Sequence, residues 1–310
     1  MPIELTRISA AQLQTLSKEK SVFFFPVAPL EDHGPHLPMG LDLEEAIQLC
    51  RIAAQHLEEE MPGWIGVVMP AAPLGLESNT TLFALTVRPY VLRDWLVDAC
   101  KMMIQNGFCH FVCFSGHLGP RQLTAIEDAA GLVRKIARKQ RVKNLFFQIS
   151  SPFPTLISAS SALISKRDVI RSPFWPDPEE HGGEKDTAKA LVLMKQFVLP
   201  NYQELPRIDR EASRWKRNWL RRTGALSGYW GDPAKANVET GEQELLGNLD
   251  AIFPKMKAVW EGANPNRFFR TWYSILAPNK SFFKAWLLVV CVSIVLGAWA
   301  YLTYFGLHLE

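Results

Sequence analysis

The chain has little excess of charge of either sign. Its 310 residues carry 34 lysines and arginines against 31 acidic residues, which gives a formal net charge of +3. This balance lacks the basic footprint with which proteins bind nucleic-acid phosphates. The hydrophobic share of 48% and the charged share of 21% are those of an ordinary globular protein. We therefore expect a folded protein with no nucleic-acid partner.

Cysteine is scarce, and it shows no pairing pattern. The five cysteines are an odd number and are scattered along the chain, at Cys50, Cys100, Cys109, Cys113 and Cys291. The first four stand in apolar stretches, which is typical of small core residues. Cys109 and Cys113 are four apart in an expected strand, but no second cysteine pair follows to complete a zinc site. Nothing indicates a disulfide framework, and a reducing compartment fits this usage.

Long apolar runs are missing from most of the chain, and the first 20 residues lack the apolar core of a signal peptide. The exception is the segment from Ala285 to Leu307, which has 23 residues without a charge. Roughly 20 apolar residues span a bilayer as a helix. Trp286 at one end, with Tyr301 and Tyr304 near the other, resembles a pair of interfacial anchors. A buried core helix is the alternative, but we predict a transmembrane helix over 285–307.

The charges beside this run predict its orientation. Four basic residues precede it, namely Arg267, Arg270, Lys280 and Lys284. The other flank carries only Glu310. Because positive flanks stay in the cytoplasm, we expect a domain over residues 1–262 on the cytoplasmic side of the cell membrane. A linker over 263–284 would join it to a single-pass C-terminal anchor.

Residues 1–262 alternate between two kinds of segment. Short apolar runs predict strands at 21–29, 63–73, 108–114 and 142–150. Helical spacing of apolar residues predicts helices at 42–60, 90–107 and 121–140, and another that starts near Asp186. Asp42 is expected to cap the first helix, and Gly107 to end the second. This alternation predicts an α/β domain with a mainly parallel sheet.

Two polar clusters follow predicted strands, where open α/β sheets gather their ligands. The stretch "PLEDHGPHLPMGLD" (29–42) comes after the first strand and holds four candidate residues, Glu31, His33, His36 and Asp42. The turn "SGHLG" (115–119) comes after the third and holds His117. Each histidine alone is typical of a turn or a core position. Together with acids at strand ends, they favour a metal site.

A third segment, "EEHGGEKDTA" (179–188), adds His181 and Glu184. Two carboxylates, a further carboxylate that can bridge, and imidazoles form a reasonable ligand set for two Zn²⁺ or Mn²⁺ ions. Such a pair of ions makes hydroxide available near neutral pH and polarises a carbonyl oxygen. The pattern therefore indicates hydrolytic metal chemistry.

The segment "PVAPLEDHGPHLPMGLD" also resembles the signature of the creatininase family, creatinine amidohydrolase and its relatives. That signature is a Glu-x-His-Gly-x-His-Leu-Pro segment followed by an aspartate. Three further segments resemble the same family in the same order: "FSGHLG" (114–119), "HGGEKDT" (181–187) and "GYWGDPAKANVETGEQ" (228–243). The resemblance extends over residues 5–260.

The resemblance implies a three-layer α/β/α sandwich with a mainly parallel sheet, and a homo-oligomer for which a hexamer is one candidate. It also implies two divalent ions, Zn or Mn, with Fe as a further candidate. Their ligands would be Glu31, His33, Asp42 and His117, with Asp42 bridging and Glu184 as the fifth. His181 would act as general acid or base and protonate the leaving nitrogen. His36 would shape the loop or bond a ligand from behind.

Some positions depart from the family pattern. Gly119 stands where creatininase itself carries a metal-binding acid, which is why Glu184 is expected to be the fifth ligand. Leu118 and Pro120 replace a glycine and an asparagine next to His117. Leu118 would narrow the pocket and make it more apolar. Asp186 stands for the second glutamate of the "HGGEKDT" segment, which is a mild change.

These features predict a membrane-anchored, metal-dependent amidohydrolase. Its metal-bound hydroxide would cleave the C–N bond of a small-molecule amide of cyclic or formyl type. Two other classes stay open. One is a scaffold protein that binds metal but has lost turnover through the changes at Leu118 and Pro120. The other is a biosynthetic peptidase of the same family.

Overall fold

The computed structural model describes residues 2–76, 83–149, 180–210, 215–216, 219–220, 223, 227–263 and 280–306. Its main sheet has four strands, β1 (Ile3–Glu4), β2 (Ser21–Val27), β4 (Ile65–Val68) and β6 (His110–Ser115). They are parallel and lie in the order β1-β4-β2-β6. The strands expected at 21–29, 63–73 and 108–114 are thus confirmed, although β4 is shorter than its prediction.

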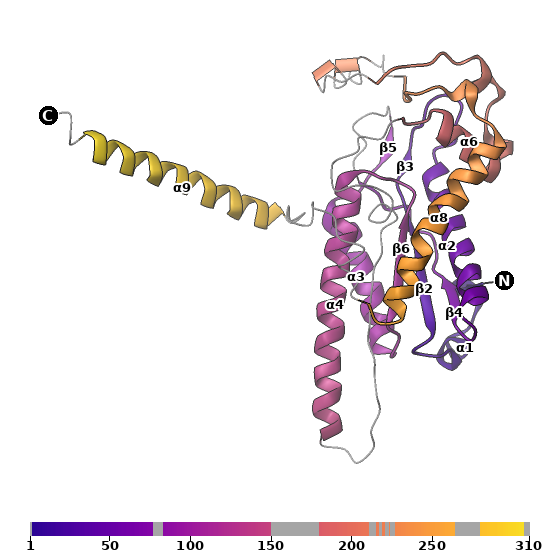
Figure 1. The fold of residues 1–310 in the computed structure, drawn as a ribbon, viewed down its shortest axis with the longest axis horizontal. Coiled ribbons are helices and arrows are strands. Elements are labelled where there is room, and N and C mark those ends of the chain that lie inside the picture. The colour runs from indigo at the N-terminus through magenta and orange to yellow at the C-terminus, as the bar shows by residue number, and fades with distance from the viewer. Residues whose placement is uncertain are drawn as a thin grey trace.

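Helices cover both faces of this sheet (Figure 1). One face packs against α2 (Leu41–Glu60) and α8 (Val238–Trp260), and the other against α3 (Pro89–Gln105) and α4 (Pro120–Ile149). Successive side chains of β2 point to opposite faces of the sheet. Phe24 is therefore part of the hydrophobic core under α2 and α8, and Phe23 part of the core under α3 and α4. Each such buried aromatic stabilises the fold by about 1.5–3 kcal/mol. The predicted α/β fold with helices on both faces of a parallel sheet is confirmed.

Some of the smaller elements lie beyond the carboxyl ends of β2 and β6 (Figure 1). A second sheet pairs β3 (Leu30–Glu31) with β5 (Ala84–Leu85) in antiparallel fashion. Helix α6 (Glu184–Leu193) packs against α8 and α2. The remaining short helices are α1 (Ala10–Thr15) and the 3-10 helices at Leu5–Arg7, Lys195–Phe197, Pro200–Glu204 and Pro233–Lys235.

Two expectations about local structure are wrong. The segment 142–150 was expected to be a strand, but α4 continues through Ile149, and residue 150 lies outside the described part. The run 121–149 contains no proline, so nothing stops the helix where its apolar spacing weakens. Asp42 was expected to cap α2, but Gly40 is the N-cap and Asp42 stands in the first turn. The carboxylate of Asp42 points toward His33 and His117 instead.

The end of α3 agrees with its prediction. The helix stops at Gln105, and Gly107 follows with a φ of 91°, a conformation that glycine adopts without a steric penalty. The main-chain N–H of Gly107 donates to the oxygen of Ile104 at 3.0 Å. The chain then turns directly into β6.

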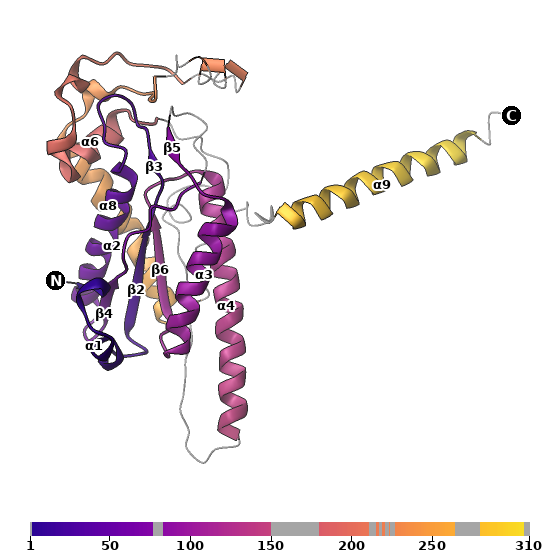
Figure 2. The same ribbon diagram turned by 180° about the vertical axis from the view of Figure 1, so that it is seen from behind.

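Helix α9 (Lys280–Gly306) lies apart from the α/β body (Figures 1 and 2). Its stretch Leu287–Tyr304 is long and apolar enough to cross a membrane, and none of it is buried in the protein. The helix begins within the segment 263–284 that was expected to be a linker. Residues 264–279 of that segment lie outside the described part.

Candidate metal centre

The polar clusters after β2 and β6 come together because the two strands end side by side. Val27 at the end of β2 is paired with Ser115 at the end of β6. Beyond Val27 the chain forms β3, where the N–H of Glu31 donates to the oxygen of Met39 at 2.9 Å. This return brings the start of α2, with Asp42, back to the strand ends. His117 follows directly after β6.

Glycine at position 116 allows the closest approach. A Cβ built on Gly116 would collide with the main-chain oxygen of Asp42, so any larger residue would push β6 away from α2. The turn after β6 therefore lies directly against the first turn of α2. This contact explains how His117 reaches the carboxylate of Asp42.

The first group of candidate ligands consists of Glu31, Asp42 and His117, whose ligand atoms all lie within 4.8 Å of one another. Nδ1 of His117 is 2.8 Å from Oε2 of Glu31 and 3.5 Å from Oδ2 of Asp42. Glu31 is 1% exposed and Asp42 4%. Two carboxylates and an imidazole nitrogen thus converge on one buried point, the donor set that Zn²⁺ and Mn²⁺ accept.

Two of these oxygens are poorly satisfied within the described part of the chain. Oε2 of Glu31 and Oδ2 of Asp42 are fully buried, and neither has a hydrogen-bond partner there. Nδ1 of His117 is the nearest cationic group to both oxygens. A buried carboxylate oxygen that lacks a donor is costly unless a cation is bound to it. The residues present therefore fit a metal ion at this position.

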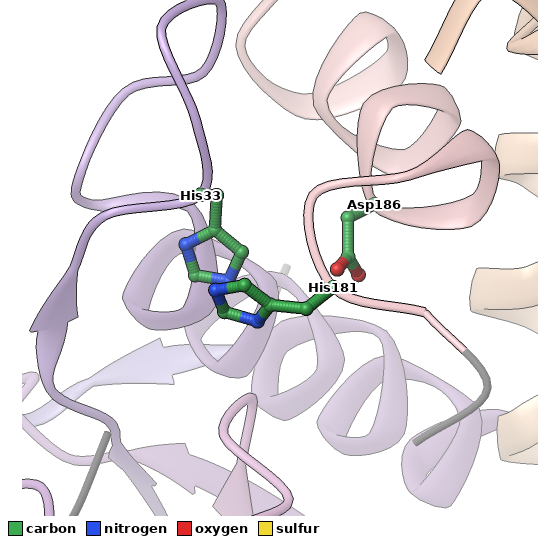
Figure 3. A group of neighbouring side chains, drawn as sticks. All are labelled: His33, His181 and Asp186. Carbon is green, nitrogen blue, oxygen red and sulfur yellow. The ribbon is translucent and has the colours of Figure 1, made fainter. Parts of the chain in front are cut away.

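A second group consists of His33, His181 and Asp186, again within 4.8 Å of one another. Figure 3 shows the two imidazole rings face to face, with the carboxylate of Asp186 to one side. The ring centroids are 4.2 Å apart at an interplanar angle of 26°. His33 comes from the loop after β3, while His181 and Asp186 come from the start of α6 and the loop before it. The site thus joins segments about 150 residues apart in sequence.

Hydrogen bonds determine which nitrogen of His33 is available. Its Nδ1 is 3.0 Å from the main-chain oxygen of Glu31, so Nδ1 carries the proton and donates it. In the neutral ring the lone pair of Nε2 then faces Oδ1 of Asp42, 3.2 Å away. Two lone pairs at this distance repel each other unless a proton or a metal ion lies between them. Asp42 thus reaches both groups, one oxygen toward each, as a bridging ligand does.

The charges of the site hold protons on two imidazoles when no metal competes. Burial alone would lower the pKa of His33, but the carboxylate of Asp42 raises it to about 10. Burial also opposes protonation of His117, and Glu31 with Asp42 raises its pKa to about 10. Metal binding at these nitrogens therefore has to release protons.

His181 is in a different state from these two. Burial lowers its pKa below the usual value, and the positive charge of His33 lowers it further. Its Nε2 donates to the main-chain oxygen of Asp32 at 2.9 Å, so Nδ1 carries the lone pair of the neutral ring. The indole of Trp230 stacks on the imidazole, with centroids 4.9 Å apart. These contacts hold the imidazole of His181 in one orientation.

The loop that presents His181 also needs glycine. Gly182 has a φ of 60°, and a Cβ there would collide with the main-chain oxygen of His33. The backbone of the third segment thus lies directly against the first. The main chains of His181 and Trp230 also bond to each other through two hydrogen bonds, of 3.0 and 2.8 Å. These contacts fix the imidazole relative to His33.

Five of the sequence-predicted site residues, Glu31, His33, Asp42, His117 and His181, are brought together in the two groups. Glu184, the expected fifth ligand, begins α6 and belongs to neither group among the described residues. Its role stays a prediction. Asp186, which the sequence reasoning treated only as a mild change, lies in the second group. Its place at the family's second glutamate was the signal that could have identified it.

Two further residues support the loops around the site. His36 is fully buried, and its Nε2 is 2.8 Å from the hydroxyl of Thr187 in α6. It lies in neither candidate ligand group. Glu180, which sequence reasoning missed, accepts hydrogen bonds from the main-chain N–H groups of Glu184 and Lys185, at 3.0 and 2.5 Å. This carboxylate caps α6 at the end that carries the site.

Comparison with known proteins agrees with the fold and places the chain in a family. Solved structures with the same fold include a mutant creatininase of the zinc–zinc type, with a TM-score of 0.56 and 18% identity, covering 84% of this chain and 98% of its own. A manganese creatininase matches with a TM-score of 0.53 and 18% identity, and the match covers 84% of this chain and 98% of its own. A mutant creatininase complexed with creatine matches with a TM-score of 0.54 and 17% identity, and the match covers 84% of this chain and 99% of its own.

At these identities the likeness of structure establishes the fold alone. No curated protein sequence matches the chain. The family model for creatininase, described as creatinine amidohydrolase, matches residues 6–252. That range contains both ligand groups and most of the α/β body. The chain therefore belongs to the creatininase family.

Proposed function

We propose that this protein hydrolyses the C–N bond of a small-molecule amide of cyclic or formyl type, with two divalent ions as cofactors. The observation that carries the proposal is the pair of ligand groups, each buried or partly buried, that meet at Asp42. In the reaction, water adds its oxygen to the amide carbon and the C–N bond breaks. The products are a carboxylic acid and an amine, or one molecule that carries both when the amide is cyclic.

Bound Zn²⁺ or Mn²⁺ would supply positive charge that polarises the amide carbonyl and makes water acidic near neutral pH. Glu31, Asp42 and His117 would hold one ion, and His33 and Asp42 would reach toward the other. Asp186 is our first candidate to complete the second position, because it lies beside His33 and His181. Glu184 is kept as the alternative, because it stands in the same first turn of α6.

His181 is proposed to move the proton. Its ring is neutral, because burial lowers its pKa, and its Nδ1 lone pair is free to accept a proton while Nε2 remains bonded to Asp32. A proton taken from water at Nδ1 can be passed to the leaving nitrogen, which must become an amine. Ligation and proton transfer are exclusive roles for one nitrogen. If His181 moves the proton, the second ion depends on His33, Asp42 and an acid of α6.

Leu118 is proposed to help select the substrate. Leu118 follows His117 directly and is 39% exposed. A partly exposed leucine beside a ligand favours an amide that carries an apolar group there. One methylene of apolar contact is worth about 0.8 kcal/mol. The Leu118→Gly variant should therefore lose discrimination between amides that differ in apolar bulk.

The experiment is a screen of amides with protein loaded with Zn²⁺ or Mn²⁺. The panel includes creatinine, other cyclic amides, formamides and small acylated amines, with release of amine as the readout. We expect turnover of at least one cyclic or formyl amide, and loss of turnover in His181→Gln with retention of both ions. Turnover that survives in His181→Gln would remove the proton-transfer role. Two bound ions with no turnover of any amide would favour the scaffold alternative.

We further propose that α9 anchors the protein in the cell membrane, with the α/β domain on the cytoplasmic side. The length and apolar character of Leu287–Tyr304 support an anchor. The basic flank and the single acidic residue at the other end support the orientation. A homo-oligomer stays a prediction from the family resemblance. A protease-protection assay on sealed vesicles tests the orientation, since a domain on the outer side would be digested.

A further inference from the structure

A buried ion-pair bridge lies next to the second ligand group. Nζ of Lys189 is 2.7 Å from Oε2 of Glu45 and 2.9 Å from Oδ1 of Asp186. The side chain of Glu45 is fully buried and that of Lys189 is 12% exposed. Burial works against the charge on Lys189, but the two carboxylates raise its pKa well above the usual value. A lysine buried between two acids is thus a fixed positive charge in this site.

The bridge joins the two helices that carry the site. Glu45 stands three residues after Asp42 in α2, and Lys189 stands three residues after Asp186 in α6. Residues three apart on a helix lie on the same face. The Glu45–Lys189 contact therefore lies one turn away from Asp42 and Asp186 on both helices. It ties the two helices together beside these two acids.

The bridge also fixes the rotamer of Asp186. Its Oδ1 accepts from Lys189, and its Oδ2 accepts from the N–H of Gly182 at 2.8 Å. Both oxygens are held, and each keeps one lone pair. Groups that orient a ligating carboxylate from behind typically change metal affinity by roughly 10- to 100-fold. The ammonium of Lys189 is such a group for Asp186.

We propose that Lys189 is a positioning residue for the second cation position, which is assembled only while the Glu45–Lys189–Asp186 bridge is intact. The ion pairs of Lys189 are with Glu45 and Asp186 and not with Glu31 or Asp42. We therefore expect the first position, at Glu31, Asp42 and His117, to keep its ion when Lys189 is replaced. The two positions therefore respond differently to a change at 189. The inference rests on the proposed function only for the expectation that two ions bind.

The test uses the full-length protein and counts ions, so that it does not depend on turnover. Lys189→Met alone would leave the buried carboxylate of Glu45 without its cation and is expected to destabilise the fold. The decisive variant is therefore the double substitution Glu45→Gln with Lys189→Met, which removes both charges. Glu45→Gln alone keeps Lys189 on Asp186. Lys185→Met is the matched control, since Lys185 stands in the same helix but pairs with Glu244 at 2.8 Å on the surface.

Equilibrium dialysis against Mn²⁺, with elemental analysis and EPR of coupled ion pairs, gives the affinity of each position. We expect the double variant to keep the first ion and to bind the second roughly 10- to 100-fold more weakly. The EPR signal of the coupled pair should disappear with it. Glu45→Gln and Lys185→Met should retain both ions.

The proposal would be overturned if the double variant bound the second ion as tightly as the wild type, or more tightly. An equal loss in Lys185→Met, or a wild type that binds only one ion, would also overturn it. A wild type that binds two ions but cleaves no amide would contradict the proposed function and leave the role of Lys189 intact. The two failures are therefore distinguishable.

Discussion

Nε2 of His33 lies 3.2 Å from Oδ1 of Asp42, while Nδ1 of the same ring donates to the main-chain oxygen of Glu31. The pair is buried, with 2% of His33 and 4% of Asp42 exposed. The ring is therefore held with its second nitrogen aimed at a carboxylate. Only a proton or a metal ion satisfies both atoms, and the other oxygen of Asp42 reaches toward His117. Asp42 connects the two candidate metal positions.

Replacing Asp42 by asparagine should remove metal from both positions. The amide keeps the size of the side chain but loses the charge that two cations would share. We expect ion content to fall from about two per chain to less than one. Mutating a residue that only hydrogen-bonds to a metal ligand lowers metal affinity by up to roughly 100-fold, and losing a ligand that bridges two ions should lower it further. Elemental analysis after dialysis checks this. Asp94→Asn, at an exposed acid paired with Arg93, is the control and should retain both ions.

Paired substitutions in α6 should identify the fifth ligand. Asp186→Asn is expected to weaken the second ion by roughly 10-fold or more, whereas Glu184→Gln should leave ion affinity unchanged. The reason is that Asp186 lies within 4.8 Å of the other two members of its group. Metal titration of both variants decides between the acids. If Glu184→Gln alone loses the second ion, the assignment based on family resemblance is correct and ours is wrong.

Glycine at position 182 should be needed for the stability of the fold. Gly182→Ala adds a Cβ that collides with the oxygen of His33 at a positive φ, so we expect a loss of about 1–3 kcal/mol in the free energy of unfolding. Denaturant titration measures it. Gly247→Ala is the control, because that helical glycine has open space around it and alanine should add about 0.5–1 kcal/mol. An unchanged stability in Gly182→Ala would show that the loop adapts.

His110 should make the fold sensitive to acid. Burial lowers its pKa from 6.5 to about 4, and its Nε2 bonds to the main-chain oxygen of Glu19. The unfolded chain binds the proton first, so stability from this group is complete above pH 6.5 and is lost as the pH falls toward 4. The loss in the free energy of unfolding approaches about 3 kcal/mol.

The His110→Gln variant tests this contribution. Its free energy of unfolding should depend less steeply on pH between 6.5 and 4 than that of the wild type, measured by denaturant titration across that range. His56→Gln, at a partly exposed histidine of α2, controls for the loss of an imidazole in general. Parallel pH curves for wild type and His110→Gln would contradict the expectation.

Removing residues 280–310 should release the protein from membranes. This deletion takes away α9, whose Leu287–Tyr304 stretch has no buried residue to lose. We expect the shortened chain to stay in the supernatant after ultracentrifugation and to retain its ion content. The full chain should pellet and resist extraction by high salt. A shortened chain that still pellets would mean that another surface binds the membrane.

The centre of the site was predictable because its chemistry coincides with strand ends. Parallel strands end at the same edge of a sheet, so the residues after β2 and β6 had to lie close together. Glu31, His33 and His117 follow from that rule alone. Asp42 was also identified, both as a bridging ligand, which stays a prediction, and as a helix cap, which is wrong. The turn of Gly40 places the helix start earlier than its polar residue suggested.

The contribution of α6 was harder to predict. Two acids, Glu184 and Asp186, stand in the first turn of α6, and helical rotation decides which of them faces His33. Sequence spacing cannot supply that rotation without knowing how α6 packs on α2, so Asp186 and Lys189 were missed. The wrong prediction of a strand at 142–150 has a similar origin. Aromatic residues there suit a strand, but α4 continues because no breaker separates the two segments.

The most direct measurement is amide hydrolysis by metal-free protein titrated with Zn²⁺ or Mn²⁺, with Asp42→Ala in parallel. We expect activity to rise with added metal, to saturate near two ions per chain and to be absent in Asp42→Ala at every metal concentration. Equal turnover by the wild type and Asp42→Ala would contradict this expectation, because both candidate positions depend on that carboxylate.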